Sequence, residues 1–261
     1  MRQFLSDSTL IRKREELFAD QEELQREEFS TKIQEYYSLR CVPQILGPIY
    51  DTLEYAKEVV EHEINSTNDN PVIIPSENNV YHGGNFHGDY VSFEMDKVKI
   101  AMTKLSILAE RQLNYLLNDR LNKKFPPFLN SKKLGLNFGL QGLQFTATST
   151  TAENQALCTP LYVHSIPSNY DNQDVVSMGT NSALMAKQVI DNSFQVMSVL
   201  LMGVSQAIDL LPAKEKNKLS DKTKNIHQLI RDKASFISDD LPQSETLKNI
   251  FNFIKENPIS I

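Results

Sequence analysis

Hydrophobic residues recur at helical spacing over several long stretches of the chain, and glycine and proline are rare within them. From Asp89 to Phe125 there is neither glycine nor proline. Apolar residues there step by threes and fours, which places them on one stripe of an α-helix. The stripe consists of Val98, Ala101, Met102, Leu105, Leu108, Ala109, Leu113 and Leu116. Ile100 and Ile107 lie off the stripe, which predicts that more than one face of the helix is buried.

Three other stretches predict helices. Thr180–Met202 again lacks glycine and proline, and its apolar residues spread around the helix. Asp51–Asn65 has an inward-facing apolar stripe and an aspartate as its N-terminal cap. Leu143–Thr159 is rich in threonine, which is poor for an isolated helix, but Gly-containing turns bracket it and its neighbours are long helices. The pattern predicts an all-α fold, a bundle of long helices with functional loops at their ends.

Turn-forming residues separate these helices. Asn68–Pro71 predicts a turn in which the residue before the proline is extended. The glycines of residues 82–88 predict a loop, and the proline pair after Phe125 ends the longest helix. Residues 165–172 form a long polar connection.

The composition changes after Pro212 to Lys-rich and polar. Two short amphipathic helices are predicted there, around Lys218–Arg231 and Thr246–Lys255. We therefore expect residues 1–212 to form the helical bundle and residues 213–261 to form a small, solvated C-terminal helical cap.

Composition and charge exclude several classes of protein. Of the 261 residues, 40% are hydrophobic and 23% charged, which is typical of a packed soluble core. The 27 basic and 33 acidic residues give a net charge of −6, the wrong sign for electrostatic binding of nucleic acid. Only two cysteines occur, Cys41 and Cys158, which excludes a disulfide scaffold and indicates a reducing compartment.

We expect no membrane segment and a cytoplasmic location. The most apolar window, Val196–Val204, is far shorter than the roughly 20 apolar residues of a bilayer span. The first residues lack the apolar stretch of a signal peptide. Because long helices in isolation expose large apolar stripes, self-association is expected.

Gln34, Tyr37 and Arg40 are the first group of polar residues that suggests chemistry. On a helix their i, i+3, i+6 spacing brings an amide, a phenol and a guanidinium close to one face. A guanidinium is the usual bidentate partner of a carboxylate, and a phenol donates or transfers a proton. The alternative from spacing alone is a surface helix with a salt-bridged arginine.

The loop at residues 82–88 is the second group. Its glycines allow close backbone approach and present Asn85, Phe86 and His87 on a tight turn. His82 and His87 are five residues apart with no Cys or Glu companion, which is a weak pattern for a metal site, so no metal is expected.

Two further polar segments complete the set. Asn65–Pro71 predicts an ordered Asx-rich turn. Asn172-Gln173-Asp174 places amides just before a segment expected to be buried, Val175–Gly179. Buried amides need partners, so they either brace a neighbouring loop or face a ligand.

Six motifs occur together in a recognisable order. They are Tyr37–Gln44 (YSLRCVPQ), Asn68–Pro71 (NDNP), Gly83–Gly88 (GGNFHG), Ala109–Arg111 (AER), Pro126–Leu129 (PPFL) and Asn172–Val175 (NQDV) with Ser177–Gly179 (SMG). Their order and spacing resemble the C-terminal half of the aromatic amino-acid and histidine ammonia-lyases. The similarity runs from Leu5 through Asp209 and is greatest to the bacterial tyrosine ammonia-lyase branch.

The resemblance implies a fold, a prosthetic group and a reaction. The fold is a mostly helical tetramer with a central bundle of the aspartase/fumarase-like type. The electrophile is 4-methylideneimidazol-5-one, formed autocatalytically from an Ala-Ser-Gly tripeptide. The substrate amine adds to it, a tyrosine base removes the β-proton, and ammonia leaves to give an unsaturated acid, here coumarate or cinnamate.

By motif position the resemblance also implies roles for individual residues. Arg40 would clamp the substrate carboxylate. Tyr37 and Gln34 would line the electrophile and the substrate, and Phe86 would pack against the prosthetic ring. The remaining positions, which would contact the amino-acid end of the substrate or line the pocket, are Asn172, Gln173 and Gln141.

One departure from the family is decisive for activity. None of the nine glycines follows a serine, so the Ala-Ser-Gly precursor does not occur in this chain. The tyrosine base and the substrate-selecting residues would also lie upstream of Met1. We therefore expect a fragment, a split gene product or a recombinant piece that lacks the N-terminal half and is inactive alone.

The resemblance is compatible with more than one function. The leading one is part of a tyrosine or phenylalanine ammonia-lyase. Gln173 and Val175 favour this over a histidine ammonia-lyase, because the histidine branch has glutamate and histidine at those positions. The related aminomutase shares the chemistry, and a non-catalytic subunit that pairs with a full-length homologue stays open. A fumarase–aspartase enzyme is excluded because no Gly-Ser pair occurs.

Overall fold

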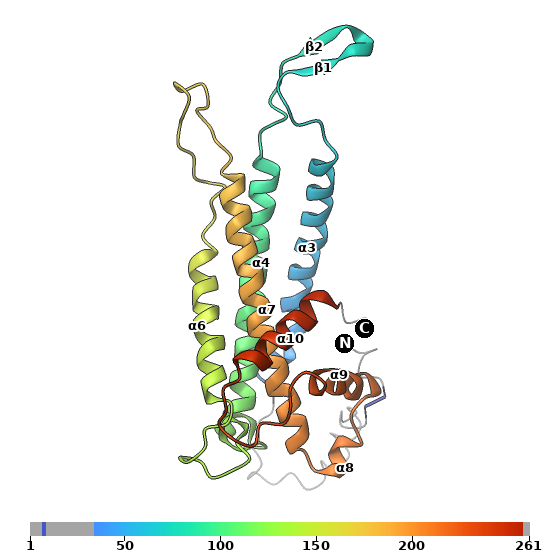
Figure 1. Cartoon of the computed structure of the whole chain (residues 1–261), viewed down its shortest axis with the longest axis vertical. Helices are drawn as coiled ribbons and strands as arrows, with labels where there is room; N and C mark the ends of the chain where they lie inside the picture. Colours follow the sequence, from blue (N-terminus) through green and yellow to red (C-terminus); the bar gives the residue numbers. More distant parts are fainter. Residues whose placement is uncertain (1–6, 9–33, 258–261) are drawn as a thin grey trace. The chain divides into compact units, whose positions relative to one another are not determined.

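The computed structural model describes residues 7–8 and 34–257, and this part of the chain is mostly helical, with nine α-helices (Figure 1). The predicted all-α class is confirmed. The helices are α2 (Tyr37–Arg40), α3 (Val42–Ile64), α4 (Asp89–Leu117), α5 (Asp119–Asn122), α6 (Gln141–Leu157), α7 (Gly179–Leu210), α8 (Ala213–Lys216), α9 (Asp221–Arg231) and α10 (Ser244–Glu256). Two short 3-10 turns are η3 (Pro75–Glu77) and η4 (Pro127–Leu129).

A small hairpin that the pattern did not predict lies between α3 and α4. Strands β1 (Val72–Ile74) and β2 (Asn79–Tyr81) pair antiparallel, with Ile73 opposite Val80. Turn η3 joins them and ends at Asn78, whose φ of 47° is left-handed. Asparagine tolerates that conformation better than most residues, because its short side chain can bond locally.

All four long predicted helices are present, but three boundaries differ from the prediction. Helix α3 begins at Val42 rather than Asp51 and contains Pro48. Helix α4 ends at Leu117, well before the proline pair, so those prolines do not terminate it. Helix α7 continues past Met202 to Leu210 and is the longest helix of the described chain.

Side-chain contacts explain the end of α4 and the extension of α7. The amide of Asn122 donates hydrogen bonds at 3.0 Å to the carbonyl oxygens of Tyr115 and Leu116. Carbonyls at a helix end have no partner within the helix, and these bonds satisfy them. In α7, a Cβ on Gly203 would lie 2.9 Å from Leu113 Cδ1, so glycine here permits close packing rather than ending the helix.

The chain divides into two compact units. Unit 1 comprises the described residues up to Pro43, Leu108–Thr148 and the described residues from Phe194 onward. Unit 2 comprises Gln44–Ile107 and Ser149–Ser193. Helices α3, α4, α6 and α7 contribute residues to both units. The boundary expected between residues 212 and 213 stays a prediction.

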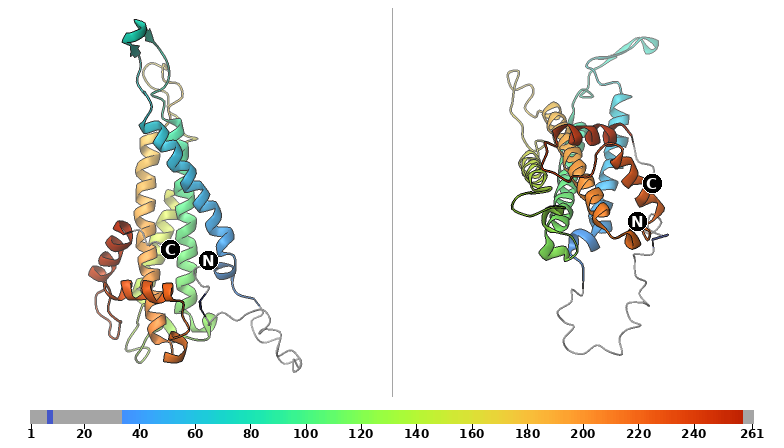
Figure 2. Two further views of the ribbon diagram at one scale, coloured as in Figure 1. Left: turned by 90° about the vertical axis from the view of Figure 1, so that its right-hand side faces the viewer. Right: turned by 60° about the horizontal axis from the view of Figure 1, so that its bottom comes forward.

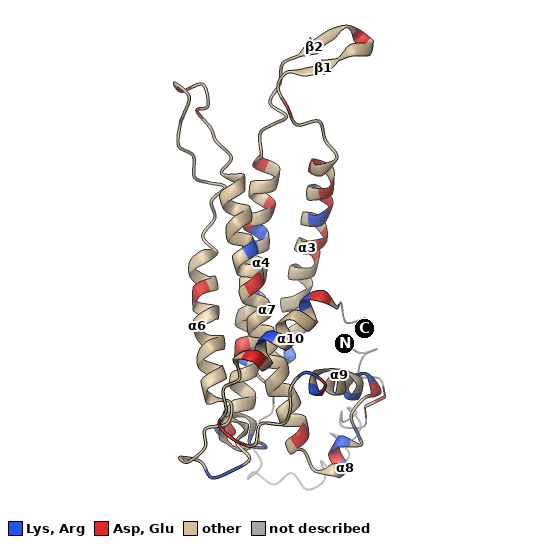
Figure 3. Cartoon of the chain, viewed as in Figure 1, with Lys and Arg blue, Asp and Glu red and all other residues tan. Residues whose placement is uncertain are grey.

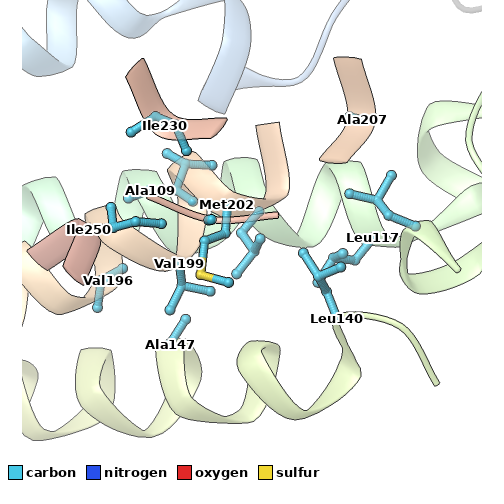
Figure 4. Close-up of a cluster of buried hydrophobic side chains, with 14 of the residues drawn as sticks. Ala109, Leu117, Leu140, Ala147, Val196, Val199, Met202, Ala207, Ile230 and Ile250 are labelled. Atoms are coloured by element: carbon cyan, nitrogen blue, oxygen red, sulfur yellow. The ribbon is translucent and has the colours of Figure 1, made fainter. Parts of the chain in front are cut away.

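Unit 1 has an apolar core to which five helices contribute (Figure 4). The residues labelled in the figure are Ala109, Leu117, Leu140, Ala147, Val196, Val199, Met202, Ala207, Ile230 and Ile250. Ile230 of α9 and Ile250 of α10 have no exposed surface. Both amphipathic helices predicted after Pro212 therefore contribute to this core. Burial of an isoleucine side chain stabilises the fold by about 1.5–3 kcal/mol.

Helix α9 lies beside the C-terminal part of α7 in unit 1 (Figure 2). A polar network joins the two helices. Arg231 Nε lies 2.6 Å from Asp209 Oδ2, and the same guanidinium donates to the carbonyl of Ala234. Buried Gln206 donates to the carbonyl of Ile237 at 2.8 Å and accepts from its amide at 3.1 Å. The side chains of Arg231, Asp209 and Gln206 therefore all have hydrogen-bond partners, which offset the loss of water on burial.

Unit 2 combines a small apolar cluster with a buried polar seam. Ala56, Val98, Met102 and Val189 form the cluster. Beside it, the amide of Asn154 on α6 donates to Ser106 Oγ of α4 at 2.9 Å and to Ser193 Oγ of α7 at 3.3 Å. Because hydrogen bonds are directional, this seam specifies how the three helices align within unit 2.

The apolar character of α7 is greater than the sequence pattern suggested. By length and composition alone this helix would suffice to cross a membrane. However, 61% of its most apolar window is buried within the chain, as in the core helix of a packed protein. The expectation that the chain holds no window of such length is corrected accordingly.

Replacing Gly139 by alanine is expected to destabilise unit 1 by about 1–3 kcal/mol. Gly139 has a φ of +56°, and a Cβ there would lie 2.6 Å from the backbone oxygen of Phe128. Gly142→Ala is the matched control, because nothing lies within 4 Å of its Cβ position. It is expected to be neutral or stabilising by up to about 1 kcal/mol. Urea denaturation of the 261-residue chain measures the free energy of unfolding of both variants. Equal changes in the two variants would contradict the requirement for glycine at residue 139.

Candidate active site

Gln34, Tyr37 and Arg40 lie together at α2, in unit 1. The Arg40 guanidinium donates a hydrogen bond to Gln34 Oε1, and its central carbon lies 4.9 Å from the centre of the Tyr37 ring. All three residues are exposed. No ion pair to Arg40 occurs within the described residues, so the salt-bridged alternative finds no partner there. Among the described residues, the guanidinium contacts the Gln34 amide and the Tyr37 ring.

Contacts with α4 hold this short helix in place within unit 1. Gln112 Nε2 donates to the carbonyl of Ser38 at 2.8 Å. The rings of Tyr36 and Tyr115 meet edge to face with their centres 5.9 Å apart. A helix of four residues is unstable alone, so these contacts with α4 fix the position of Arg40.

In unit 2, two of the predicted loops are joined by side-chain amides. We call residues 65–71 the Asx turn and residues 82–88 the glycine loop. Asn70 Oδ1 accepts from the amide of Gly83 at 3.0 Å, and Asn85 Nδ2 donates to the carbonyl of Thr67 at 3.3 Å. The expected ordered turn is present, and it braces the loop that carries Phe86.

A third segment, residues 158–178, packs against the glycine loop; we call it the amide loop because it carries Asn172 and Gln173. His87 Nε2 lies 3.1 Å from the carbonyl oxygen of Val175. A Cβ on Gly88 would lie 3.2 Å from Ser177 Oγ, and one on Gly179 would lie 3.1 Å from the carbonyl oxygen of Gly88. Glycine at these two positions permits the close approach of the two loops.

The contacts of His87 indicate a structural role. Its Nδ1 lies 3.6 Å from Asp89 Oδ2, and its Nε2 faces the amide loop. Both ring nitrogens therefore have protein partners. The described residues contain no group of three or more His, Cys, Asp or Glu side chains with the geometry to hold a metal ion.

Phe86, Asn172 and Gln173 are exposed on these unit 2 loops. Gln173 Oε1 accepts from Ser168 Oγ at 3.0 Å, and the backbones of the same two residues are hydrogen-bonded to each other. The segment after the amides is not buried as expected, since Val175 is 61% exposed. The reason is that the amide loop extends beyond the helix ends of unit 2 (Figure 1), where few side chains of this unit can cover it.

Comparison with known proteins identifies the family. The sequence profile described as aromatic amino acid lyase matches residues 1–232, which include all six motifs. The chain belongs to this family. The match confirms the resemblance inferred from the motifs, although it does not test the roles of individual residues.

Two curated relatives and one solved structure show how much of the family this chain represents. The tyrosine ammonia-lyase of Cupriavidus metallidurans is 38% identical over 263 residues, 99% of this chain but 49% of that protein. The MIO-dependent tyrosine 2,3-aminomutase of Streptomyces globisporus is 44% identical over 200 residues, 76% of this chain and 36% of that protein. The phenylalanine aminomutase of Pantoea agglomerans superposes with a TM-score of 0.88 at 34% identity, over 97% of this chain and 49% of that one.

The chain thus spans about half the length or less of the relatives it matches. The structural match confirms the helical bundle of the ammonia-lyase type expected from the resemblance. The relatives include both lyases and aminomutases, so family membership alone leaves the reaction between these two classes.

In this member of the family, Gln141 occupies a different setting from the other predicted residues. It starts α6 and lines a groove in unit 1 of about 640 Å³, together with Phe138, Phe145, Gln195 and Leu241. The last four residues are separated along the chain and match no motif, so the sequence pattern did not predict them as lining residues.

The segment after α9 shapes one side of this groove. The carboxylate of Asp240 accepts from the amides of Phe138 and Gly139, at 2.9 and 3.2 Å. Its neighbour Asp239 accepts from Lys132 and from Ser238, and these hydrogen bonds lower the pKa of the Asp239 carboxyl. Two consecutive carboxylates thus connect the C-terminal segment to residues 132–139, which precede α6.

Proposed function

We propose that this chain supplies the substrate-binding residues of an enzyme that eliminates ammonia from tyrosine or phenylalanine, giving coumarate or cinnamate. The observation that carries the proposal is the Gln34–Tyr37–Arg40 group, in which a guanidinium is oriented but not neutralised by a described carboxylate. Its planar fork of donors matches a carboxylate bidentately. The tyrosine ammonia-lyase similarity over 99% of the chain supports the substrate class.

The charge distribution supports Arg40 as the carboxylate clamp. Residues 58–96 and 134–186, which include the Asx turn, the glycine loop and the amide loop, contain no lysine or arginine (Figure 3). These loops offer amides and aromatic rings. Asn172 and Gln173 suit the amino-acid end of a substrate through hydrogen bonds, whereas Arg40 carries the positive charge that suits a carboxylate.

The prosthetic group of the family, 4-methylideneimidazol-5-one, supplies an electrophile for the substrate amine. The residues present fit a planar ring of this kind. Phe86 is 54% exposed and offers an aromatic face, and nothing lies within 4 Å of a Cβ built on Gly84. Tyr37, 69% exposed, offers a phenol that can donate or transfer a proton. The group itself would form from a Ser-Gly sequence that this chain lacks.

A second candidate function is that of an aromatic aminomutase, which retains the ammonia and returns it to the neighbouring carbon. The 44% identity to a tyrosine 2,3-aminomutase favours it. Chromatography of the products of the complete protein distinguishes the two. An unsaturated acid with free ammonia supports the lyase, whereas a β-amino acid as the main product supports the aminomutase.

The complete protein is expected to prefer tyrosine or phenylalanine to histidine. Gln173 presents a neutral amide, and Val175 beside it is apolar. A neutral amide is compatible with an aromatic ring at lower desolvation cost than an unpaired carboxylate. A competition assay with all three amino acids, read by product absorbance, tests this expectation. Urocanate forming with the highest kcat/KM would restore the histidine branch.

Gln173→Glu sharpens that test. We expect it to lower kcat/KM for the aromatic substrate by about tenfold or more, because it places a charge beside an apolar ring. Gln155→Glu, an exposed position on α6 in the same unit, is the matched control and should change kcat/KM little. Similar losses in both variants would remove Gln173 from the binding site.

A further inference from the structure

A buried ion pair on α4 reaches the backbone of the amide loop. Asp96 and Lys99 lie on one face of the helix with their charged atoms 2.7 Å apart, and their side chains are 3% and 0% exposed. Asp96 Oδ2 accepts from the amide of Tyr162 at 2.6 Å. Lys99 Nζ donates to the carbonyl of Thr159 at 2.8 Å. All four residues belong to unit 2.

Such a pair is costly to bury for stability alone. Removing two charges from water often costs more than their mutual attraction returns, and well-packed apolar residues serve a core as well or better. The bonds to the loop offset part of that cost, because each charge gains a backbone partner. Thr159 C=O and Tyr162 N–H are also the two groups that close a β-turn when they bond to each other. In this loop the carbonyl of Thr159 instead accepts from Lys99, and the amide of Tyr162 donates to Asp96.

Further contacts carry this anchor along the amide loop. The rings of Phe93 and Tyr162 pack with their centres 4.7 Å apart. Ser165 Oγ accepts a hydrogen bond from the amide of Val176 at 2.8 Å, which joins the first part of the amide loop to its last part. The exposed tip between them carries Asn172 and Gln173, so the position of both amides depends on how the loop base is held.

We propose that Asp96 and Lys99 are positioning residues that hold the amide loop so that Asn172 and Gln173 meet the amino-acid end of the substrate. The role of the two amides rests on the proposed function. The anchoring of the loop by the ion pair rests on the geometry of unit 2 and is measurable without activity.

A neighbouring pair on the same helix provides a matched control. Glu94 and Lys97 have the same i, i+3 spacing and a charge separation of 2.6 Å, and the Glu94 side chain is 4% exposed. Glu94 has no hydrogen bond to the amide loop among the described residues. Glu94→Gln therefore perturbs a buried carboxylate of α4 and removes neither of the two hydrogen bonds from the ion pair to the loop.

The test uses two double variants of the full chain that differ only at residue 96. D96L/K99M removes both charges and both loop bonds, and D96N/K99M keeps a side-chain oxygen that can accept from the Tyr162 amide. Both are uncharged, so no unpaired charge remains to unfold the core. Asparagine and methionine are close in volume to the native side chains, whereas leucine is larger than aspartate, so protection of α7 is followed as the check on core packing. Hydrogen exchange measured by mass spectrometry follows residues 159–176.

In D96L/K99M, exchange at the loop base is expected to be about tenfold or more faster than in the native chain, as for loss of a charge-assisted hydrogen bond. Protection of the core of α7 should stay unchanged. D96N/K99M is expected to retain more protection at Tyr162, and Glu94→Gln to match the native chain. Native-like exchange of the loop in D96L/K99M, or equal acceleration in Glu94→Gln, would overturn the proposal.

A kinetic arm links the anchor to the substrate in the complete protein. Misplaced binding amides should raise KM for the aromatic amino acid about tenfold or more in D96L/K99M, with partial rescue in D96N/K99M. Faster loop exchange with an unchanged KM would overturn the positioning role. If the native complete protein has no activity, the proposed function fails, while the exchange arm still decides whether the ion pair anchors the loop.

Discussion

The purified 261-residue chain is expected to form no coumarate, cinnamate or urocanate above background. Covalent catalysis needs its reactive atom, and the electrophile of this family forms from a Ser-Gly sequence that does not occur here. The substrate-binding groups alone would hold an amino acid without activating its amine. Incubation with each of the three amino acids, followed by absorbance of the unsaturated acids, measures this. Product formation by the chain alone would contradict it.

A companion measurement separates the explanations for the missing half. Mass spectrometry of the native protein shows what accompanies the chain in the cell. An N-terminal polypeptide that carries Ala-Ser-Gly would support a split enzyme, and activity should return when both parts are present. A full-length homologue as the partner would instead support a non-catalytic subunit that modulates it.

Arg40→Lys in the complete protein is expected to lower kcat/KM about 30- to 1000-fold. Lysine keeps the positive charge but loses the planar fork that binds both carboxylate oxygens. It also loses the geometry in which Gln34 and the Tyr37 ring orient the cation. Steady-state kinetics with tyrosine and phenylalanine provide the measurement.

The control for Arg40 is Arg120→Lys, a change of the same kind at an exposed position on α5. It should leave kcat/KM within threefold of the native value. A similarly small change for Arg40→Lys would mean that Arg40 stabilises α2 and does not bind the substrate. Circular dichroism of both variants checks that the helices are retained.

Helical periodicity was sufficient to predict the long helices, because apolar residues at this spacing form a single stripe that can pack against a core only when the segment is helical. The ends of those helices depended on contacts that no local pattern contains. The side chain of Asn122 caps α4. Because Gly203 has no side chain, α7 packs closely against Leu113 of α4 and continues beyond this position. Gly203 is a packing position inside α7.

The candidate site was predictable to a similar extent. The sequence predicted that Gln34, Tyr37 and Arg40 converge on one helix face. Tyr37 and Arg40 do share helix α2, but Gln34 precedes the helix and reaches Arg40 from a non-helical segment, so the expected helix over all three residues is corrected. The glycine loop was also predicted correctly, because several glycines within seven residues are incompatible with a stable helix. Its joining to the amide loop through His87 and Val175 was not predictable, since these residues lie far apart along the chain. Their distance in sequence carries no information about their contact.

Helix α4 shows most clearly what the sequence determined by itself and what only the tertiary structure decided. Its apolar stripe is written in the residue order, and with it the helix and its inward face. A second stripe is polar and recurs at the same period: Ser92, Asp96, Lys99, Thr103, Ser106 and Glu110. A polar stripe ordinarily predicts a solvated face, yet every one of these residues is at most 5% exposed.

Neighbouring segments decide the fate of that second stripe. In unit 2, Ser106 bonds Asn154 of α6, and Asp96 and Lys99 bond the backbone of the amide loop. A polar group is stable in a core only when a partner replaces its water. Those partners come from parts of the chain remote in sequence. The residue order therefore determined that α4 forms and which face is apolar, and the tertiary structure decided, by supplying hydrogen-bond partners, that its polar face is buried as well.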